Sequence, residues 1–212
     1  MSRAANGNST QSARKLRHIL ACAARIFGQK GFEGASIREI SRVSRVSLSG
    51  LYYYVQSKQQ LLYLIQSYAF TSILESLQRR LVATSDPEQR LRIFVQNHLE
   101  YFLSHPVEMK VLSHEDEQLE GPYGKEVAEL KRRYYALGRG IIEELQASGR
   151  LRRRNARVAM MSLFGMLNWI YTWHKPRVDP GADSLAEEMC GIFLDGLRNG
   201  RGSASQRRLA SA

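Results

Sequence analysis

The sequence predicts an all-α protein, in which a short N-terminal group of helices precedes a larger helical bundle. Two observations carry this prediction. Helix-start signatures recur along the chain, as in the S-x-x-E box of Ser36 and Glu39 and the S-x-x-Q box of Ser57 and Gln60. The segments that follow these signatures carry apolar residues at the three- and four-residue spacing of an amphipathic helix.

The N-terminal group has the pattern of a helix-turn-helix. Residues 12–28 are apolar on one side, which favours a first helix that steadies the next two. The capping box predicts a second helix from Ile37, which residues 44–46 interrupt. Ser47 is expected to cap a short third helix over residues 48–54. Two helices joined by about three residues can place the later one in the DNA major groove.

Charge and side-chain size support a DNA-binding role for this group. Residues 1–60 contain ten Lys or Arg and two acidic residues, whereas residues 61–200 contain eighteen of each. The outward residues of the helix at 48–54 are small, hydroxylic or aromatic, which allows close approach to base edges and phosphates. A membrane-surface helix also uses basic charge, and residues 12–28 come nearest to one, but we interpret their apolar side as a packing face.

The order of these features resembles the TetR family of transcriptional regulators. The matching pattern is G-F-x-G-x-S-I-x-x-I, a turn, and V-S-x-x-x-L-Y-x-Y-V-x-S-K-x-x-L-L, and it covers roughly residues 14–65. Three positions depart from the family: Ser44-Arg45 replaces Ala-Gly in the turn, Val55 replaces Phe, and Ser41 replaces Ala. A non-glycine residue at φ > 0 in the turn costs about 1 kcal/mol. Either a phosphate contact of Arg45 would offset this cost, or the turn differs from that of the family.

The resemblance implies a set of DNA contacts. Ser36 would bind a phosphate at a helix N-terminus, and Lys58 would bind another at the start of the following helix. Leu51 and Tyr54 are expected in the core instead. The residues implied to face DNA are Ser36, Arg38, Arg45, Ser47, Leu48, Ser49, Gly50, Tyr52, Tyr53 and Lys58.

The rest of the chain predicts further helices, over residues 58–81, 87–104, 108–114, 121–148, 156–174 and 184–200. Asp86, Asn155 and Ser184 are the expected caps, the last with Glu187 closing its box. Residues 158–173 are apolar nearly all round and span about 24 Å, which is too short for a membrane. Such a helix must be covered on every face, so we expect a second subunit on one side.

For residues 58–200 the resemblance implies a ligand cavity and a dimer. Aromatic and polar residues on mainly apolar helices are candidates for the cavity, although each could equally be core: Tyr68, His98, Tyr101, Phe102, Tyr134, Asn168, Trp169 and Trp173. The expected four-helix dimer interface contains Phe164, Leu167, Ile192, Phe193 and Leu197. A symmetric dimer would place two recognition helices about one DNA turn apart and read a palindrome.

These features give four expected segments: a disordered N-terminus (1–11), a helix-turn-helix DNA-binding domain (12–57), a ligand-binding and dimerisation domain (58–200) and a disordered Arg/Ser-rich tail (201–212). The chain has no signal peptide and no run of 18 apolar residues, so we expect a cytoplasmic protein. Cys22 and Cys190 are expected to be buried, reduced thiols.

Known catalytic motifs are absent from the sequence: it has no H-E-x-x-H, C-x-x-C, phosphate-cradling glycine loop or nucleophile elbow. The acidic cluster at residues 114–117 is a weak metal candidate, because consecutive helical residues point in different directions. We therefore predict no enzyme, metal or cofactor. The arginines at 150 and 152–154 are interpreted as a solvated loop, with a phosphate hook for an acyl-CoA as the alternative.

The predicted function is a ligand-responsive, sequence-specific transcriptional regulator. We expect a repressor that a small apolar or amphipathic effector, such as an acyl-CoA or fatty acid derivative, releases from a palindromic operator. The alternative is a non-specific structural DNA-binding protein without an effector, which predicts affinity that does not depend on DNA sequence.

Overall fold

The computed structural model describes residues 3–114 and 118–198, and the described chain is helical throughout. It forms two compact units. The N-terminal unit contains residues up to 73 and residues 104–132, and the C-terminal unit contains residues 74–103 and those from 133 onward. The expected tail at 201–212 lies outside the described residues. The predicted all-α class is confirmed.

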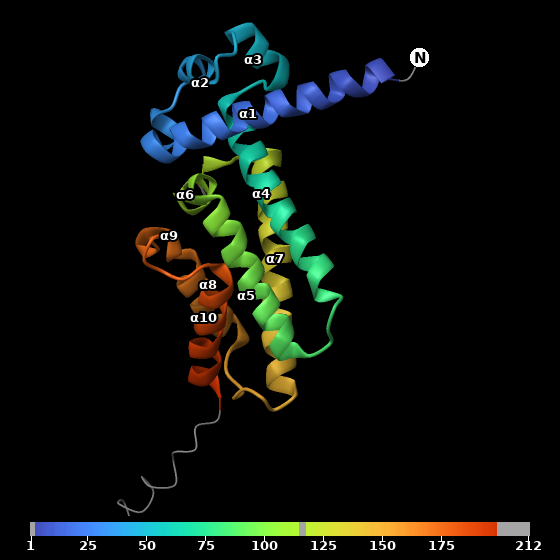
Figure 1. The fold of residues 1–212 in the computed structure, drawn as a ribbon, viewed down its shortest axis with the longest axis vertical. Coiled ribbons are helices and arrows are strands. Elements are labelled where there is room, and N and C mark those ends of the chain that lie inside the picture. The colour runs from blue at the N-terminus through green and yellow to red at the C-terminus, as the bar shows by residue number, and fades with distance from the viewer. Residues whose placement is uncertain (1–2, 115–117, 199–212) are drawn as a thin grey trace, which may run out of the picture. The chain divides into compact units, whose positions relative to one another are not determined.

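The N-terminal unit contains α1 (Arg3–Gly34), α2 (Ile37–Ser44), α3 (Leu48–Tyr54) and α6 (Pro106–His114), with parts of α4 (Lys58–Leu81) and α7 (Gly121–Ala147). Figure 1 shows α2 and α3 as two short helices beside the long α1. Its core combines α1 residues such as Ile19, Ala23 and Phe27 with Ile40 of α2 and Leu51 of α3. The helix-turn-helix is therefore held on α1, as the sequence predicts.

The boundaries of α1 differ from expectation. It begins at Arg3, whereas we expected no regular structure over residues 1–11. Once the packed part of a helix has formed, each further residue adds a hydrogen bond without a new nucleus, so the helix extends into a polar segment. Near its other end, Gly31 has a non-helical φ of 72° and kinks the chain before Phe32 enters the core.

The C-terminal unit contains α5 (Pro87–Ser104), α8 (Ala156–Asn168), α9 (Ile170–Trp173) and α10 (Ala182–Leu197), with the remaining parts of α4 and α7. The predicted single helix over residues 156–174 is wrong, because it breaks at Trp169. The Trp169 carbonyl accepts the Thr172 N–H at 3.1 Å and its hydroxyl at 2.7 Å. That carbonyl closes a tighter turn than an α-helix, which separates α8 from α9.

The cap predicted for the last helix is also wrong. The N-cap of α10 is Gly181, and Leu185 donates its N–H to the Gly181 carbonyl at 3.0 Å. Ser184 lies inside α10 and is not its N-cap, and the Glu187 carboxylate binds Arg92 of α5 at 2.6 Å. By contrast, Asp86 caps α5 through the N–H of Gln89, and Asn155 caps α8, as predicted.

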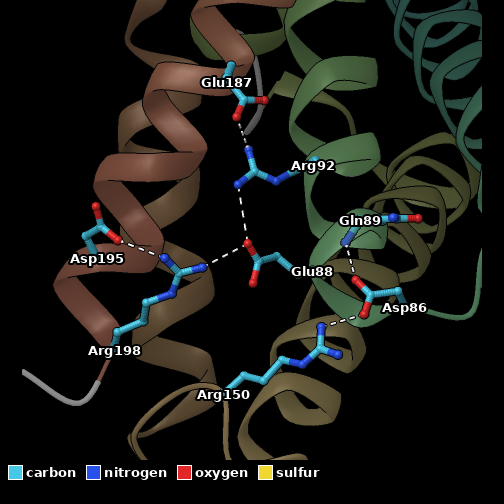
Figure 2. A network of polar contacts seen from close by, with 8 residues as sticks. All are labelled: Asp86, Glu88, Gln89, Arg92, Arg150, Glu187, Asp195 and Arg198. Atoms are coloured by element: carbon cyan, nitrogen blue, oxygen red, sulfur yellow. Dashed lines mark hydrogen bonds and ion pairs between the residues drawn. The ribbon is translucent and has the colours of Figure 1, made fainter.

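A network of charged residues ties α10 to α5 (Figure 2). Arg92 bridges Glu187 and Glu88, and Arg198 binds Glu88 at 2.8 Å. Burial alone would raise the pKa of Glu88, but hydrogen bonds from Arg198 and Arg92 outweigh it and lower the pKa. Arg150 binds Asp86 at the start of the same helix. The last helix is thus tied to α5 by ion pairs.

Both cysteines are buried free thiols, as predicted. Burial raises the pKa of Cys190 to about 11, so its thiol stays protonated. Within the described residues, no helix has a stretch long and apolar enough to cross a membrane.

Candidate functional site

Two serines and one left-handed residue build the turn between α2 and α3. Ser41 donates its hydroxyl to the Val46 carbonyl at 2.6 Å, and Ser44 donates to the Ser41 carbonyl at 3.2 Å. Arg45 has φ 54° and ψ 33°, so the positive φ expected in this turn is confirmed. His18 of α1 is bonded to the Ser44 carbonyl at 3.1 Å. Ser41, where the resembled family has Ala, therefore contributes a bond that closes the turn.

Both short helices begin at the predicted caps. Ser36 accepts the Glu39 N–H, and Ser47 accepts the Gly50 N–H, each at 3.1 Å. A Cβ at Gly50 would lie 3.0 Å from the Ser47 hydroxyl oxygen, so glycine gives this cap its room. The caps fix the start of α3 and hence the direction in which its side chains point.

The outward side of α3 is open to solvent. Tyr53 is 81% exposed and Tyr52 is 50% exposed, whereas Leu51 is fully buried and Tyr54 packs on the core. The core placement of Leu51 and Tyr54 is thus confirmed. Most of the predicted DNA-facing residues are exposed, namely Ser36, Arg38, Arg45, Ser47, Leu48, Ser49, Tyr52 and Tyr53, while Gly50 and Lys58 are half-buried. Their contact with DNA stays a prediction.

Lys58 has a structural partner that the sequence did not indicate. Its Nζ donates to the Phe32 carbonyl at 2.8 Å and lies 4.3 Å from the centroid of the Phe32 ring. The ammonium therefore anchors the end of α1 to the start of α4. An ammonium has three N–H groups, so a phosphate contact remains compatible with this arrangement.

A basic segment of α1, formed by Arg14, Lys15 and Arg17, is not among the residues that the sequence predicted to face DNA. All three side chains are exposed, and none takes part in an ion pair with another described side chain. The first acidic residue of the chain is Glu33. Counting charges helix by helix would have found this segment.

An aromatic group in the C-terminal unit surrounds one buried histidine; we call it the His98 cluster. It contains His98 with Phe94, Phe102, Tyr134 and Phe164. The His98 ring is 1% exposed, its Nδ1 lies 3.0 Å from the Tyr134 hydroxyl, and its centroid lies 3.8 Å from that of Phe102. Burial lowers the pKa of His98 to about 3, and a hydrogen bond with the Asn168 side chain acts in the opposite direction. The ring is therefore neutral at pH 7.

Gly138 of α7 lets this cluster pack closely. A Cβ at Gly138 would lie 2.7–2.9 Å from atoms of Met160 and Phe94, which is closer than side chains normally approach. Phe94 in turn stacks on Tyr134 with ring centroids 4.9 Å apart. The glycine thus sets the spacing of α7 from α5 and α8 at this level.

The structure brings together only part of the predicted ligand set. His98, Phe102 and Tyr134 meet, and Asn168 acts on the His98 ring. Tyr101 lies beside Phe102 at a centroid distance of 6.3 Å. None of the contacts described for Tyr68, Trp169 and Trp173 joins them to the His98 cluster. Trp169 is 62% exposed, Trp173 is 41% exposed, and Tyr68 is 49% exposed in the other unit.

The structure also brings together only part of the set of residues predicted to form the dimer interface. Ile192, Phe193 and Leu197 line a groove between α8 and α10 of about 630 Å³, which we call the α8–α10 groove. Leu167 is fully buried, so the structure places it in the interior of its own unit, whereas Phe164 contacts the His98 cluster and is half-buried. When a helix is apolar on every side, its sequence does not show which side faces the core of its own chain. Val158 and Met166 line the groove in their place.

The structure adds no support for a metal site at residues 114–117 or for a phosphate site at the arginines of residues 150–154. Among the described residues, no three His, Cys, Asp or Glu side chains lie close enough to hold a metal ion. The cluster at residues 114–117 lies outside the side chains that the structure describes. Arg150 is engaged by Asp86, while Arg152, Arg153 and Arg154 are exposed.

Two family models match the chain. The model described as bacterial regulatory proteins, tetR family, matches residues 19–63, which include α2 and α3. The model described as tetracyclin repressor-like, C-terminal domain, matches residues 84–197. The second match alone spans more than half of the chain, and together they cover both units.

Individual proteins similar to this chain agree with the two family models. The chain is 28% identical over 144 residues to the HTH-type transcriptional repressor NicS of Pseudomonas putida, covering 67% of this chain and 68% of NicS. The TetR family regulator PfmR of Thermus thermophilus is 26% identical with a TM-score of 0.76, covering 86% of this chain and 96% of PfmR. AibR, solved with isovaleryl coenzyme A and operator DNA, is 29% identical with a TM-score of 0.74, covering 84% and 97%. The family models and the helix-turn-helix together show that this protein belongs to the TetR family of transcriptional regulators.

Proposed function

We propose that this protein is a homodimeric repressor that binds a palindromic operator through α2 and α3 and leaves it when a small effector binds the C-terminal unit. The exposed, uncharged outward side of α3 is the observation that carries the DNA-binding part. Residues 12–57 would form the DNA-binding domain and residues 58–200 the ligand-binding and dimerisation domain. The exposed arginines and serines of α2 and α3 would hold the phosphate backbone on either side of the groove.

The basic segment of α1 extends this surface. Arg14, Lys15 and Arg17 are exposed in the same compact unit as α3. We propose that they bind phosphates, which adds affinity without sequence preference.

The effector would bind at the His98 cluster, because a mainly apolar site with a few polar groups is typical of small-molecule sites. AibR, which binds isovaleryl coenzyme A, supports an acyl-CoA or related amphipathic molecule. Helix α4 begins in one compact unit and ends in the other, so a shift of α4 would connect effector binding to DNA binding. DNA affinity would then fall through linkage.

In vitro selection from random duplex DNA tests the proposal, with protein that has been unfolded and refolded to remove bound small molecules. We expect a palindrome whose half-sites lie about one helical turn apart. Salt-sensitive binding with no enriched sequence would instead establish the non-specific DNA-binding protein and refute the regulator.

Replacing Lys58 with Met is expected to have two separate effects. Loss of the bond to the Phe32 carbonyl and of the contact with its ring should lower the free energy of unfolding by about 2 kcal/mol. Loss of a phosphate contact should lower the salt slope of DNA binding by about one. Urea unfolding and DNA titrations over a salt series measure the two effects, with Lys125→Met, at an exposed lysine of α7, as the control. An unchanged salt slope would leave Lys58 a purely structural role.

Replacing Ile192 with Glu is expected to weaken dimerisation at least about 100-fold, because a carboxylate would lose water in an apolar interface. Ile192 is 67% exposed and lines the α8–α10 groove, so the change should not disturb the fold of one chain. Sedimentation equilibrium measures the dissociation constant. Val178→Glu is the matched control, since Val178 is 79% exposed and does not line the groove. Equal dissociation constants for both variants would contradict this interface.

A further inference from the structure

The first residues of α3 include only one side chain that can distinguish one base pair from another. In a helix-turn-helix, the N-terminal residues of the second helix are those that contact base edges. In this chain they are Leu48, Ser49 and Gly50. Gly50 has no side chain, and a serine hydroxyl can both donate and accept, so it is compatible with every base pair. Leu48 is the residue whose contact depends on which base it meets.

The serine hydroxyls at this end of α3 are partly occupied by bonds within the protein. The Ser47 oxygen accepts the Gly50 N–H at 3.1 Å and lies 3.3 Å from the Ser49 hydroxyl oxygen. One of the two hydroxyl protons is used between these oxygens, which leaves one proton for the DNA. A single hydroxyl donor bonds to a phosphate as readily as to a base, so it adds affinity without selecting a base.

The rest of the segment from the end of the turn to the end of α3 cannot form paired hydrogen bonds with a base. Arg and Lys recognise guanine, Asn and Gln recognise adenine, and Asp and Glu accept from cytosine. Residues 46–55 read VSLSGLYYYV and contain none of these six residue types. Direct readout by α3 therefore has to use apolar contact.

Leu48 is available for such a contact. Val46 and Leu51 belong to the core and are 7% and 0% exposed, whereas Leu48 is 39% exposed and does not belong to it. The exposed surface of a leucine gains free energy when another apolar group covers it. The 5-methyl group of thymine is the apolar group that base pairs present in the major groove.

We infer that Leu48 is the specificity-determining residue of α3 and reads the 5-methyl group of a thymine in each half-site of the operator. The inference rests on the proposed function, because it names the base that the proposed DNA-binding surface selects. A T·A pair is then required opposite the start of α3. A C·G pair is disfavoured there, since cytosine has no methyl group and presents a polar amino group.

Replacing thymine with uracil tests this contact, because the two bases differ only in the methyl group. The DNA is the operator obtained by in vitro selection, with one thymine position at a time changed in both half-sites. At one position we expect affinity to fall about 15-fold, since burial of one methyl group accounts for about fourfold in each half-site. At that position 5-methylcytosine should weaken binding less than cytosine does. Fluorescence anisotropy measures the affinities, and a series in which no position responds to uracil would overturn the inference.

Two variants show whether Leu48 itself makes the contact. Leu48→Ala removes the apolar surface, so its affinities for the thymine and uracil operators should agree within about twofold. Arg45→Gly is the matched control: it removes an exposed side chain next to α3 and suits the φ of 54° at this position. It should bind more weakly but keep the full difference between the two operators. An undiminished difference in Leu48→Ala would also overturn the inference.

Failure of the proposed function gives a different result. A selection that enriches no sequence refutes the regulator and this inference together. An enriched operator whose affinity does not respond to uracil overturns the inference alone and leaves the proposed function standing. The uracil series on the wild-type protein decides the methyl contact even where a variant binds too weakly to be measured.

Discussion

Replacing Arg14, Lys15 and Arg17 with Ala is expected to weaken DNA binding by roughly two to three orders of magnitude at 0.1 M salt. Each lost phosphate contact should lower the slope of log affinity against log salt by about 0.9, so the triple variant should lose nearly three units of slope. The loss should be the same for operator and random DNA, because phosphate contacts carry no sequence information. Fluorescence anisotropy over a salt series measures both quantities.

The matched control is the triple variant of Arg152, Arg153 and Arg154. These three side chains are also exposed, but they belong to the other compact unit. Their removal changes the net charge by the same amount and should leave the salt slope unchanged. If both triple variants lowered the slope equally, net charge and not a binding surface would explain the effect. If neither did, α1 would have no role in DNA binding.

Lowering the pH from 7 to 4 is expected to reduce the free energy of unfolding by about 3 kcal/mol through His98 alone. The pKa of His98 is about 3 in the folded chain, against an ordinary value of 6.5. Between these values the unfolded chain binds the proton and the folded chain does not. Stability therefore falls as the pH falls below 6.5, and the loss is complete only near pH 3.

The carboxylates of Asp86 and Glu88 titrate below most of this window. The pKa of Asp86 is lowered by the Gln89 N–H and Arg150, and that of Glu88 is lowered by Arg198 and Arg92 despite its burial. These carboxylates lose their contribution only below about pH 4.5, where the unfolded groups begin to bind protons. Urea unfolding at pH 7, 5.5 and 4 isolates His98. The double variant His98→Phe, Tyr134→Phe should lose most of the dependence between pH 6.5 and 4.5, and an unchanged dependence would contradict this origin.

Features of short range could be predicted from the sequence. The caps at Ser36, Ser47, Asp86 and Asn155 lie where the sequence places them, because a cap bonds to an N–H two or three residues away. The left-handed turn at Arg45 is equally local. The residues of the helix-turn-helix follow a fixed pattern for the same reason, which is why the family could be identified from residues 14–65.

Features that depend on distant partners could not be predicted. The Ser184 cap fails because α10 begins at Ala182, and Glu187 instead binds Arg92 of another helix. Lys58 has the Phe32 carbonyl as a partner, which lies well before it in the sequence. In each case a long-range contact competes with the local interaction, and the sequence gives no measure of which is stronger.

The sequence by itself determined the helical class, the helix-turn-helix and the basic character of the DNA-binding end. Only the tertiary structure decided which apolar residues face inward, since Leu167 is fully buried while Ile192 stays exposed. It also decided that His98 meets Tyr134 across two helices. The physical reason is that helical periodicity defines the faces of one helix, whereas burial depends on how several helices pack together.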